Sequence, residues 1–441
     1  MEIGEGELDE MIFGGDDWGE VGKPKGEFFM KLHQWPLIIL GMFLVTGGGV
    51  LAAEWSRFRG PNGSGLGEAP GLAEGFTAAD FKWKVALPGR GHSSPVVWGE
   101  RIFVTGNPLG TTDRVIACLR VKDGGTIWKK VYPTGGYRMH SDNNYAASTP
   151  AVDGERVYFH WASPESSGLV ALDQKDGREV WRVDLGPFIS QHGPGTSPIV
   201  FEDVVLLNFD QDQPKSYLIA VEAKTGKERW RWEHEGTKHS ASTPCIFVPA
   251  GGDAEVITES FSMGLVANNL RTGAVVWRLA NLMTKRCVAS PFVTPGGLII
   301  AQCGEGRAES FVEVVRPGSG VQSTVKVYEV LRLGGYVPTS IAVGEWLYLW
   351  KENGMVSCLK VATGELVWSE RVPGSFYGSP ICVNQRLYNM STQGDLVCLA
   401  VGGKFQAPVV VGLGEGSHAT PAVSGGRMYL RTFTQLISVG K

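Results

Sequence analysis

The sequence lacks an uninterrupted hydrophobic run of the roughly 20 residues that a membrane-spanning helix needs. Its main apolar run extends only from Trp35 to Val45, and charged residues make up 20% of the chain. A polytopic membrane protein is therefore excluded. The hydrophobic share of 43% also excludes disorder over most of the length, so the composition is that of a globular protein.

Net charge is also scarce, and it is concentrated at the start of the chain. The formal charge at pH 7 is −4, but residues 1–29 hold nine acidic residues against two lysines and so carry −7. Lys31 contributes +1, which leaves +2 for residues 54–441. A nearly neutral body provides no electrostatic attraction for nucleic acid or for a charged membrane surface. We therefore expect neither as a partner.

Short motifs that carry metal or catalytic chemistry are missing as well. No Cys-x-x-Cys or His-x-x-x-His spacing occurs, and no two cysteines are adjacent. No Gly-x-Ser-x-Gly elbow precedes a helix, so a hydrolase triad has no support. The glycine-rich segment from Gly60 to Gly65 is not followed by Lys-Ser/Thr and does not predict a phosphate-binding loop.

Residues 30–53 have the layout of a secretory signal peptide, with a basic start, an apolar run and small residues at the end. We expect cleavage near Ala53 and a periplasmic or secreted protein without a stable membrane span. An uncleaved membrane anchor is the alternative. No cysteine follows the apolar run, so no lipid-modified cysteine is expected there. Residues 1–29 form an acidic extension that is a poor signal-peptide start and is consistent with a start codon placed too early.

Residues 54–441 are organised by an internal repeat. Each unit begins with Ser/Thr-Pro and a short apolar strand, turns through a glycine, and ends in a second glycine turn followed by tryptophan. The first proline of the unit recurs as Pro95, Pro150, Pro198, Pro244, Pro291, Pro380 and Pro421, with Ser340 in the remaining position. Eight units at spacings of 40 to 55 residues, each with four strand-like runs, are typical of propeller blades. The sequence therefore predicts an all-β, eight-bladed β-propeller of four-stranded antiparallel blades.

The two ends of this repeat are expected to join. Residues 81–85 look like the tryptophan-bearing last strand of a blade although they precede the first unit, and the last unit ends after its third strand. We expect residues 81–85 to complete the last blade and so leave no open sheet edge at the seam. Burial of an aromatic ring is expected to dock each blade on the next. The tryptophans in question are Trp83, Trp128, Trp181, Trp230, Trp277 and Trp368.

The segment from Ala171 to Trp181 follows the pattern Ala-Leu-Asp-x-x-Asp/Thr-Gly-x-x-x-Trp and resembles the pyrroloquinoline quinone (PQQ) repeat. The pattern recurs at residues 220–230, 267–277 and 358–368. The resemblance extends over nearly the whole chain from Trp55 and implies the propeller fold without implying one function. Similar repeats occur in PQQ-dependent alcohol dehydrogenases and in the BamB-type outer-membrane assembly factor, which binds partners and catalyses nothing. The segment that begins at Trp55 also resembles the start of secreted bacterial members.

Polar residues are expected to surround the mouth of the central channel. In a propeller, the loops that enter each first strand and those between the second and third strands lie on one face. The predicted ligand-binding residues in these loops are His92, His140, Asp142, Asn143, His192, Asp210, Asp212, His239, Glu259, Arg286 and His418, with Arg90, Lys285, Asn208 and Gln211 beside them. Convergent polar groups around a concavity are typical of a binding site. The alternative is that they only cap strand ends and bond to neighbouring loops.

The seven cysteines predict at most one cross-link. Cys287 and Cys303 flank a hairpin that turns at residues 295–297 and would fall nearly opposite one another. In an oxidising compartment a disulfide between them is predicted. The other five lie on strands and are expected to act as small apolar residues.

The function expected from the sequence is an exported, non-catalytic binding scaffold. Its polar face would bind an envelope protein or a small-molecule or carbohydrate ligand, and we expect a monomer without a firmly assigned cofactor. The alternative is an alcohol or sugar dehydrogenase that uses PQQ and Ca²⁺, for which the resemblance casts Glu259, Asn208, Asp210 and Arg286 around the cofactor. Such enzymes carry adjacent cysteines above the quinone, and this sequence has none. An unrelated carbohydrate-active or other enzyme stays open as a third possibility.

Overall fold

The computed structural model describes residues 54–441 except 74, 307 and 308. The predictions for the acidic extension and the signal peptide therefore lie outside the described residues. Within them, the chain forms strands and two short 3-10 helices, η1 (Pro61–Gly63) and η2 (Ala78–Asp80). In this part of the chain we find no helix with the length and apolar character needed to span a bilayer. The predicted all-β class is confirmed.

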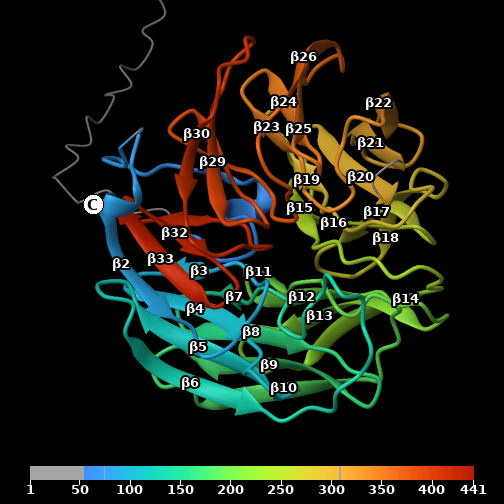
Figure 1. Ribbon diagram of the computed structural model, residues 1–441. Coiled ribbons are helices and arrows are strands. Elements are labelled where there is room, and N and C mark those ends of the chain that lie inside the picture. Colours follow the sequence, from blue (N-terminus) through green and yellow to red (C-terminus); the bar gives the residue numbers. More distant parts are fainter. Residues whose placement is uncertain (1–53, 74, 307–308) are drawn as a thin grey trace, which may run out of the picture. The chain divides into compact units, whose positions relative to one another are not determined.

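Eight sheets surround a common centre, each built mainly from strands that follow one another in the sequence (Figure 1). Blade 1 comprises β3 (Val96–Trp98), β4 (Arg101–Gly106), β5 (Arg114–Arg120) and β6 (Thr126–Tyr132). Blade 2 comprises β7 (Ala151–Val152), β8 (Arg156–Trp161), β9 (Ser167–Asp173) and β10 (Glu179–Gly186). Blade 3 comprises β11 (Ile199–Phe201), β12 (Val204–Phe209), β13 (Ser216–Glu222) and β14 (Glu228–His234). Blade 4 comprises β15 (Cys245–Phe247), β16 (Glu255–Ser260), β17 (Gly264–Asn269) and β18 (Val275–Leu279).

The second half of the chain continues the same order. Blade 5 comprises β19 (Phe292–Val293), β20 (Ile299–Glu305), β21 (Glu309–Arg316) and β22 (Val325–Leu331). Blade 6 comprises β23 (Ile341–Val343), β24 (Trp346–Trp350), β25 (Met355–Lys360) and β26 (Leu366–Arg371). Blade 7 comprises β27 (Ile381–Val383), β28 (Arg386–Met390), β29 (Asp395–Ala400) and β30 (Val409–Gly412). Blade 8 comprises β31 (Ala422–Ser424), β32 (Arg427–Arg431), β33 (Gln435–Gly440) and the early strand β2 (Phe81–Ala86).

The burial of each strand follows from its place in the blade. The first strands, such as β7, β11 and β15, lie nearest the centre, and the fourth strands, such as β10 and β14, lie at the periphery (Figure 1). Every residue of β12 is buried, because both faces of a blade pack against neighbouring blades. The outer strand β14 instead mixes exposed and buried positions. This is why the inner strands are almost continuously apolar in sequence, whereas the outer strands alternate.

The ring closes as predicted. Strand β2 pairs antiparallel with β33, with Lys84 opposite Ile437, and so completes blade 8 from the other end of the described chain. A second early strand, β1 (Leu66–Gly67), was not predicted, and it adds to blade 7 as a fifth strand parallel to β27. Both additions tie the start of the propeller to its end.

Tryptophans dock one blade on the next through a repeated contact. The Nε1–H of Trp181 in blade 2 donates to the carbonyl oxygen of Ala223 in blade 3 at 2.9 Å. Its ring lies against Gly226, where φ is +73° and an added Cβ would come within 2.7 Å of the ring. Only glycine fits this turn. The same indole-to-carbonyl bond joins Trp83 to Val121, Trp128 to Gln174, Trp230 to Leu270 and Trp368 to Gly402.

Three blades depart from this pattern, among them blade 7, whose outer strand β30 contains no tryptophan. Trp277 donates instead to the carboxylate of Glu255 in its own blade, at 3.0 Å. In blade 5, Tyr328 on β22 takes the place of the tryptophan. Its hydroxyl donates to the carbonyl oxygen of Val361 at 2.7 Å, and its ring lies against Gly364. The docking contact therefore tolerates tyrosine where the repeat has lost its tryptophan.

The Ser or Thr that opens each repeat forms a closed ring of hydrogen bonds. The backbone N–H of each one donates to the hydroxyl oxygen of its counterpart in the next blade, at 2.9 to 3.2 Å. The ring runs through Ser94, Thr149, Ser197, Thr243, Ser290, Thr339, Ser379 and Thr420 and returns to Ser94. These bonds satisfy N–H groups that lie buried between blades. In seven of the eight blades the next residue is proline, which brings no further N–H to be satisfied.

We expect Thr243→Val to lower the free energy of unfolding by about 1–3 kcal/mol, because the N–H of Ser197 would stay buried without its acceptor. Urea unfolding followed by circular dichroism measures the loss. Thr243→Ser keeps the hydroxyl and is the matched control, with a clearly smaller loss expected. Equal losses for the two variants would show that the methyl group, and not the hydroxyl, carries the effect.

A segment that the repeat analysis did not place crosses the channel just below this ring. Arg57 Nη2 donates to the carbonyl oxygen of Pro244 in blade 4, and Arg59 Nη2 to that of Ser340 in blade 6. The segment begins at Trp55, which pairs with Val97 in blade 1, and continues into β1 on blade 7. It therefore spans the channel from one side to the other.

Candidate functional site: a cavity at the centre of the propeller

A cavity of about 680 Å³ lies at the centre of the propeller. All eight members of the Ser/Thr ring contribute to its lining. Phe58, from the segment that crosses the channel below the ring, lines it as well. The other lining residues come mostly from the loops that enter the first strands, such as residues 191–195. The cavity is thus a cup with a hydroxyl-bearing wall, an aromatic floor and a rim of loops.

Most of the predicted ligand-binding residues gather at this cavity. Those that line it are His92, His140, Asp142, Asn143, His192, His239, Arg286 and His418. All five histidines that were predicted to share one face are therefore brought together. Asp210, Asp212 and Glu259 are not among the lining residues.

Glu259 and Asp210 are located in the blade walls and not at the channel mouth. Glu259 lies on β16 opposite Leu265, is fully buried, and accepts the N–H of Gln302 from blade 5 at 3.0 Å. Asp210 follows β12 and is only 1% exposed. Burial raises the pKa of Glu259 well above its usual value and that of Asp210 to about 7. Second strands lie one place outward from the channel, so their side chains pack between blades.

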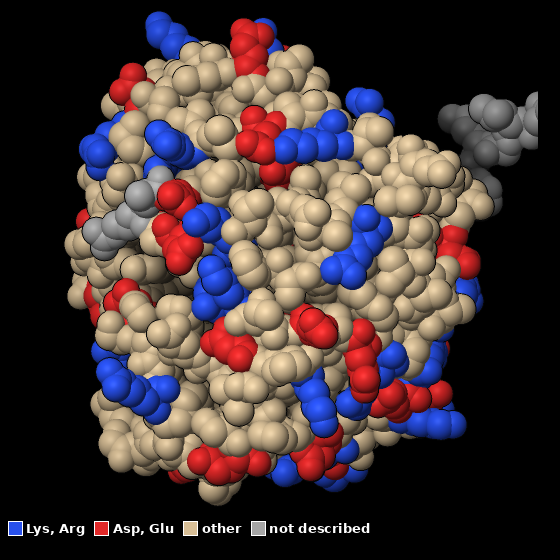
Figure 2. All heavy atoms as spheres, turned by 90° about the vertical axis from the view of Figure 1, so that its right-hand side faces the viewer, with Lys and Arg blue, Asp and Glu red and all other residues tan. Residues whose placement is uncertain are grey.

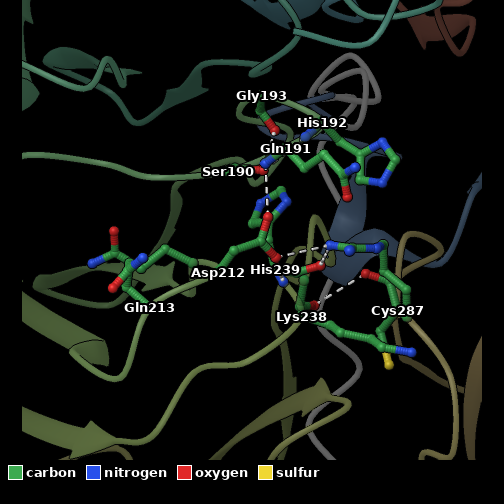
Figure 3. Close-up of polar contacts among 12 residues, drawn as sticks. Ser190, Gln191, His192, Gly193, Asp212, Gln213, Lys238, His239 and Cys287 are labelled. Atoms are coloured by element: carbon green, nitrogen blue, oxygen red, sulfur yellow. Dashed lines mark hydrogen bonds and ion pairs between the residues drawn. The ribbon is translucent and has the colours of Figure 1, made fainter.

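Asp212 organises three loops around the rim. Its carboxylate accepts the N–H of Gln191 at 2.7 Å and that of His239 at 2.6 Å, and it pairs with Arg286 Nη1 at 3.3 Å. Arg286 also donates to the carbonyl oxygen of His239. Figure 3 shows Asp212 between the Gln191 loop and His239. Burial opposes ionisation of Asp212, but the amides of His239 and Gln191 and the nearby guanidinium outweigh it, so its pKa is lowered.

Asn143 also bonds to a neighbouring loop. Its side-chain amide donates to the carbonyl oxygens of His192 at 2.8 Å and Pro194 at 3.0 Å. Together with Asp212 and Arg286, it makes the contacts expected of residues that hold loops in place. These side chains hold the loops of the rim in place. The other lining residues face the cavity and make fewer hydrogen bonds and ion pairs within the protein.

Aromatic and imidazole rings form an arc along one side of the mouth. The rings of His92 and His418 lie 4.4 Å apart, and Phe433 packs against both. Tyr377 lies 4.6 Å from His418, and its hydroxyl donates to Asp142 Oδ2 at 3.0 Å. That bond joins the loop before blade 7 to the loop before blade 2. The hydrogen bond between Tyr377 and Asp142 therefore links two loops of the rim next to His418.

Most of the cavity histidines are neutral near pH 7. Burial lowers the pKa of His92 well below its usual value, and nearby His418 and arginine charges lower it further. Burial also lowers the pKa of His418 to about 4, that of His239 to about 3, and, less strongly, that of His192. Neutral imidazoles can donate and accept hydrogen bonds, but they carry no charge to attract an ion.

The charged groups of the lining already have partners. They are Asp142 with Tyr377, Arg286 with Asp212, Lys238 and Lys285 with Glu305, and Glu352 with the N–H groups of Tyr336 and Val337. Lys238 also lies over the ring of Phe261. The cationic groups of the lining are therefore ion-paired, whereas the Asp142 and Glu352 carboxylates bond to neutral donors.

Several lining residues were not predicted from the sequence. Phe58, Lys238, Glu305, Tyr336, Glu352 and Tyr377 all line the cavity. The hydroxyl ring had a visible signal, because Ser or Thr precedes the repeat proline in every blade that has one. The other six had none, because they lie in loops, in the crossing segment or, for Glu305, at the last residue of β20.

The predicted disulfide is not formed in the structure, where Cys287 and Cys303 are free, buried thiols. Their expected juxtaposition is present, because Arg286 bridges Gly304 in an antiparallel register that sets the two cysteines opposite one another. Burial raises the pKa of the Cys287 thiol well above its usual value and that of Cys303 to about 11. Disulfide formation needs a thiolate, so burial works against it here.

The residues do not fit PQQ held by Ca²⁺. Of the four that the resemblance casts around the cofactor, Asn208, Asp210 and Glu259 are buried in the blades, away from the cavity lining. The fourth, Arg286, is engaged by Asp212 and the His239 carbonyl. Within residues 54–441, as far as they are described, no three His, Cys, Asp or Glu side chains are grouped so as to hold a metal ion. Because the side-chain oxygens of Asn208, Asp210 and Glu259 lie outside the cavity lining, they are not placed to hold a calcium ion in the cavity.

Charges of both signs are mixed over the face shown in Figure 2, with uncharged residues covering most of it. Ion pairs such as Arg229 with Asp203, at 2.6 Å, and Lys360 with Glu365, at 2.8 Å, also place opposite charges next to one another on the protein. That face therefore carries no continuous basic surface of the kind that nucleic-acid-binding proteins present.

Comparison with solved structures supports the fold. Quinohemoprotein alcohol dehydrogenase from Comamonas testosteroni superposes with a TM-score of 0.63 at 13% identity, covering 88% of this chain and 80% of that one. BamB from Moraxella catarrhalis superposes with a TM-score of 0.57 at 13% identity, covering 81% of this chain and 96% of that one. At these identities the likeness is one of fold alone.

Comparison at the level of sequence defines the family. Outer membrane protein assembly factor BamB from Moranella endobia (strain PCIT) is 26% identical over 262 residues, which are 54% of this chain and 62% of that protein. The match thus spans less than two thirds of the relative. A family model described as outer membrane protein assembly factor BamB matches residues 78–178, 165–322 and 309–404. Because these matches together extend over most of the propeller, the chain belongs to this BamB-type family of PQQ-like repeat proteins.

Proposed function

We propose that the protein is a non-catalytic binding scaffold of the bacterial envelope, and that it binds its partner at the cavity and the surrounding rim. The observation that carries this proposal is the geometry of the cavity, where the Ser/Thr ring of all eight blades and the rim loops converge, with Asp212 and Asn143 holding those loops in place. A binding face needs only a rigid frame with convergent polar and aromatic groups.

Family membership supports the same proposal. The relatives carry the description of outer membrane protein assembly factors, so we propose an envelope protein as the partner and a periplasmic or secreted location for this chain. The rim supplies suitable long loops, such as the connection between β6 and β7, which includes the exposed His140. The dehydrogenase alternative has weaker support, because its cofactor ligands are buried in the blades.

A photo-crosslinking amino acid tests the binding face. Placed at His140 on the rim, it is expected to capture an envelope protein in living cells. Placed at Lys175, an exposed residue in the turn between β9 and β10, it is expected to capture none, because that turn belongs to the opposite set of loops. Mass spectrometry identifies the captured protein.

Two results would count against the proposal. One is capture that is equal at both positions or confined to Lys175, which would remove the rim as the binding face. The other is alcohol-dependent dye reduction by the purified protein in the presence of PQQ and Ca²⁺, which would replace the scaffold by the dehydrogenase. We expect neither a spectral change nor turnover in that assay.

A further inference from the structure

The Ser/Thr ring offers an unusual array of hydroxyl donors to the cavity. In the eight ring bonds each hydroxyl oxygen acts as the acceptor of a backbone N–H from the preceding blade, as Thr149 does for Ser94 at 2.9 Å. Each hydroxyl keeps its own O–H for another acceptor. Because all eight residues line the cavity, these donors are distributed around a single axis. A ligand with many oxygen atoms could bond to several of them at once.

The floor and the mouth add flat apolar surfaces. Phe58 lines the cavity from below and is half-buried, and Tyr336 and Tyr377 line it nearer the rim. Val288 and Val337 contribute aliphatic surface between them. A ring of hydrogen-bonding groups combined with aromatic faces is complementary to a sugar, which has hydroxyls around its edge and C–H groups on its faces.

The electrostatics of the lining select against anions. Arg286 is paired with Asp212, Lys238 lies near Glu305, and Asp142 accepts from Tyr377. An anionic ligand would lose its hydration without gaining an unpaired lysine or arginine, which is costly in a desolvated site. A neutral polar ligand avoids that cost and can bond to neutral imidazoles as donors or acceptors.

We propose that the cavity binds a neutral carbohydrate, with its hydroxyls bonded to the Ser/Thr ring and one sugar face packed on Phe58. The volume of about 680 Å³ is within the range of small-molecule sites and admits an oligosaccharide end. This inference rests on the proposed function, because it names the ligand class of the same cavity. It extends that function from protein binding to recognition of a glycan.

Binding of defined sugars to the purified, folded protein tests the inference. Isothermal titration with cellobiose, maltose, diacetylchitobiose and glucose is expected to give saturable binding of at least one of these neutral sugars. A charged analogue, the anion glucuronate, is expected to bind at least about tenfold more weakly than glucose, its neutral counterpart of the same size, a difference of about 1.4 kcal/mol. Phe58→Ala is expected to weaken the best sugar at least about tenfold, whereas Lys175→Ala, remote from the cavity, should leave affinity unchanged. If Phe58→Ala is found unfolded by circular dichroism, Ser379→Ala removes one ring hydroxyl instead and should weaken binding.

Three outcomes would overturn the inference. They are no binding of any neutral sugar at millimolar concentration, binding of glucuronate as tight as that of glucose, and unchanged affinity in both folded cavity variants. Crosslinking from His140 is read independently, so a persisting protein partner without sugar binding would end the carbohydrate inference and leave the scaffold in place. Conversely, mass-spectrometric detection of a cleaved or oxidised sugar would confirm the ligand class and end the non-catalytic function.

Discussion

Replacement of Trp181 by alanine is expected to lower the free energy of unfolding by about 3–5 kcal/mol. Trp181 is 8% exposed, packs with Tyr158 at a ring separation of 5.9 Å, and carries its indole hydrogen bond into the next blade. The substitution removes the ring from the interface between blades 2 and 3 and leaves the space over Gly226 empty. Urea unfolding followed by far-ultraviolet circular dichroism measures the change.

Two further variants separate the contributions at this interface. Trp181→Phe keeps most of the ring but loses the bond to the Ala223 carbonyl, so a loss of about 1–2 kcal/mol is expected. Val180→Ala on the same strand is the matched control, since Val180 is 36% exposed and should cost under about 0.5 kcal/mol. A loss for Trp181→Ala no larger than that control would mean that blade docking does not depend on this residue.

The second large effect is expected at Asp210, where Asp210→Asn should stabilise the protein above pH 7. The carboxyl group is buried and its pKa is about 7, against about 3.9 in an unfolded chain. Between these pH values the folded state retains a proton that the unfolded state releases, so the stability of the parent protein falls as pH rises. The full penalty, about 4 kcal/mol, is present above pH 7 and absent below pH 4.

Asp212→Asn is the matched control, because its effect has the opposite sign. The pKa of Asp212 is lowered, so its charged form stabilises the fold at neutral pH, and that contribution disappears on acidification through the lowered pKa. Chemical unfolding at several pH values between 2 and 8 measures both variants, because the Asp212 contribution is lost only below about pH 4. A stability difference between Asp210→Asn and the parent that stays constant over this range would show that Asp210 does not titrate as its burial implies.

The fold could be predicted because its determinants are local and repeated. The Ser/Thr-Pro dipeptide is visible in sequence because each copy satisfies the same buried N–H, as at Thr243. The tryptophans are visible because four of them cover the same glycine turn, as at Gly226. Closure by β2 was predictable for the same reason, since Trp83 makes the contact that the other outer strands make. Because similar packing contacts recur from blade to blade, the residues that make them recur at regular spacings in the sequence.

The site was predictable only in part, and Glu259 and His239 show why. Glu259 lies near the end of a strand, and His239 lies before the beginning of one. Both could therefore be assigned to the rim from their place in the repeat. In the structure His239 lines the cavity, whereas Glu259 points between blades because it lies on a second strand. A shift of one residue along a strand moves a side chain to the other face, and position in a repeat is too coarse to resolve it.

By itself, the sequence determined the architecture: an eight-bladed ring with tryptophan-docked blades, a closed seam, and histidines gathered at one mouth. Only the tertiary structure decided that the segment after Trp55 crosses the channel, that Phe58 forms the cavity floor, and that Asp142 meets Tyr377 across the rim. The first set follows from short-range contacts that recur in every blade. The second depends on contacts made once, between residues hundreds of positions apart, which leave no period in the chain.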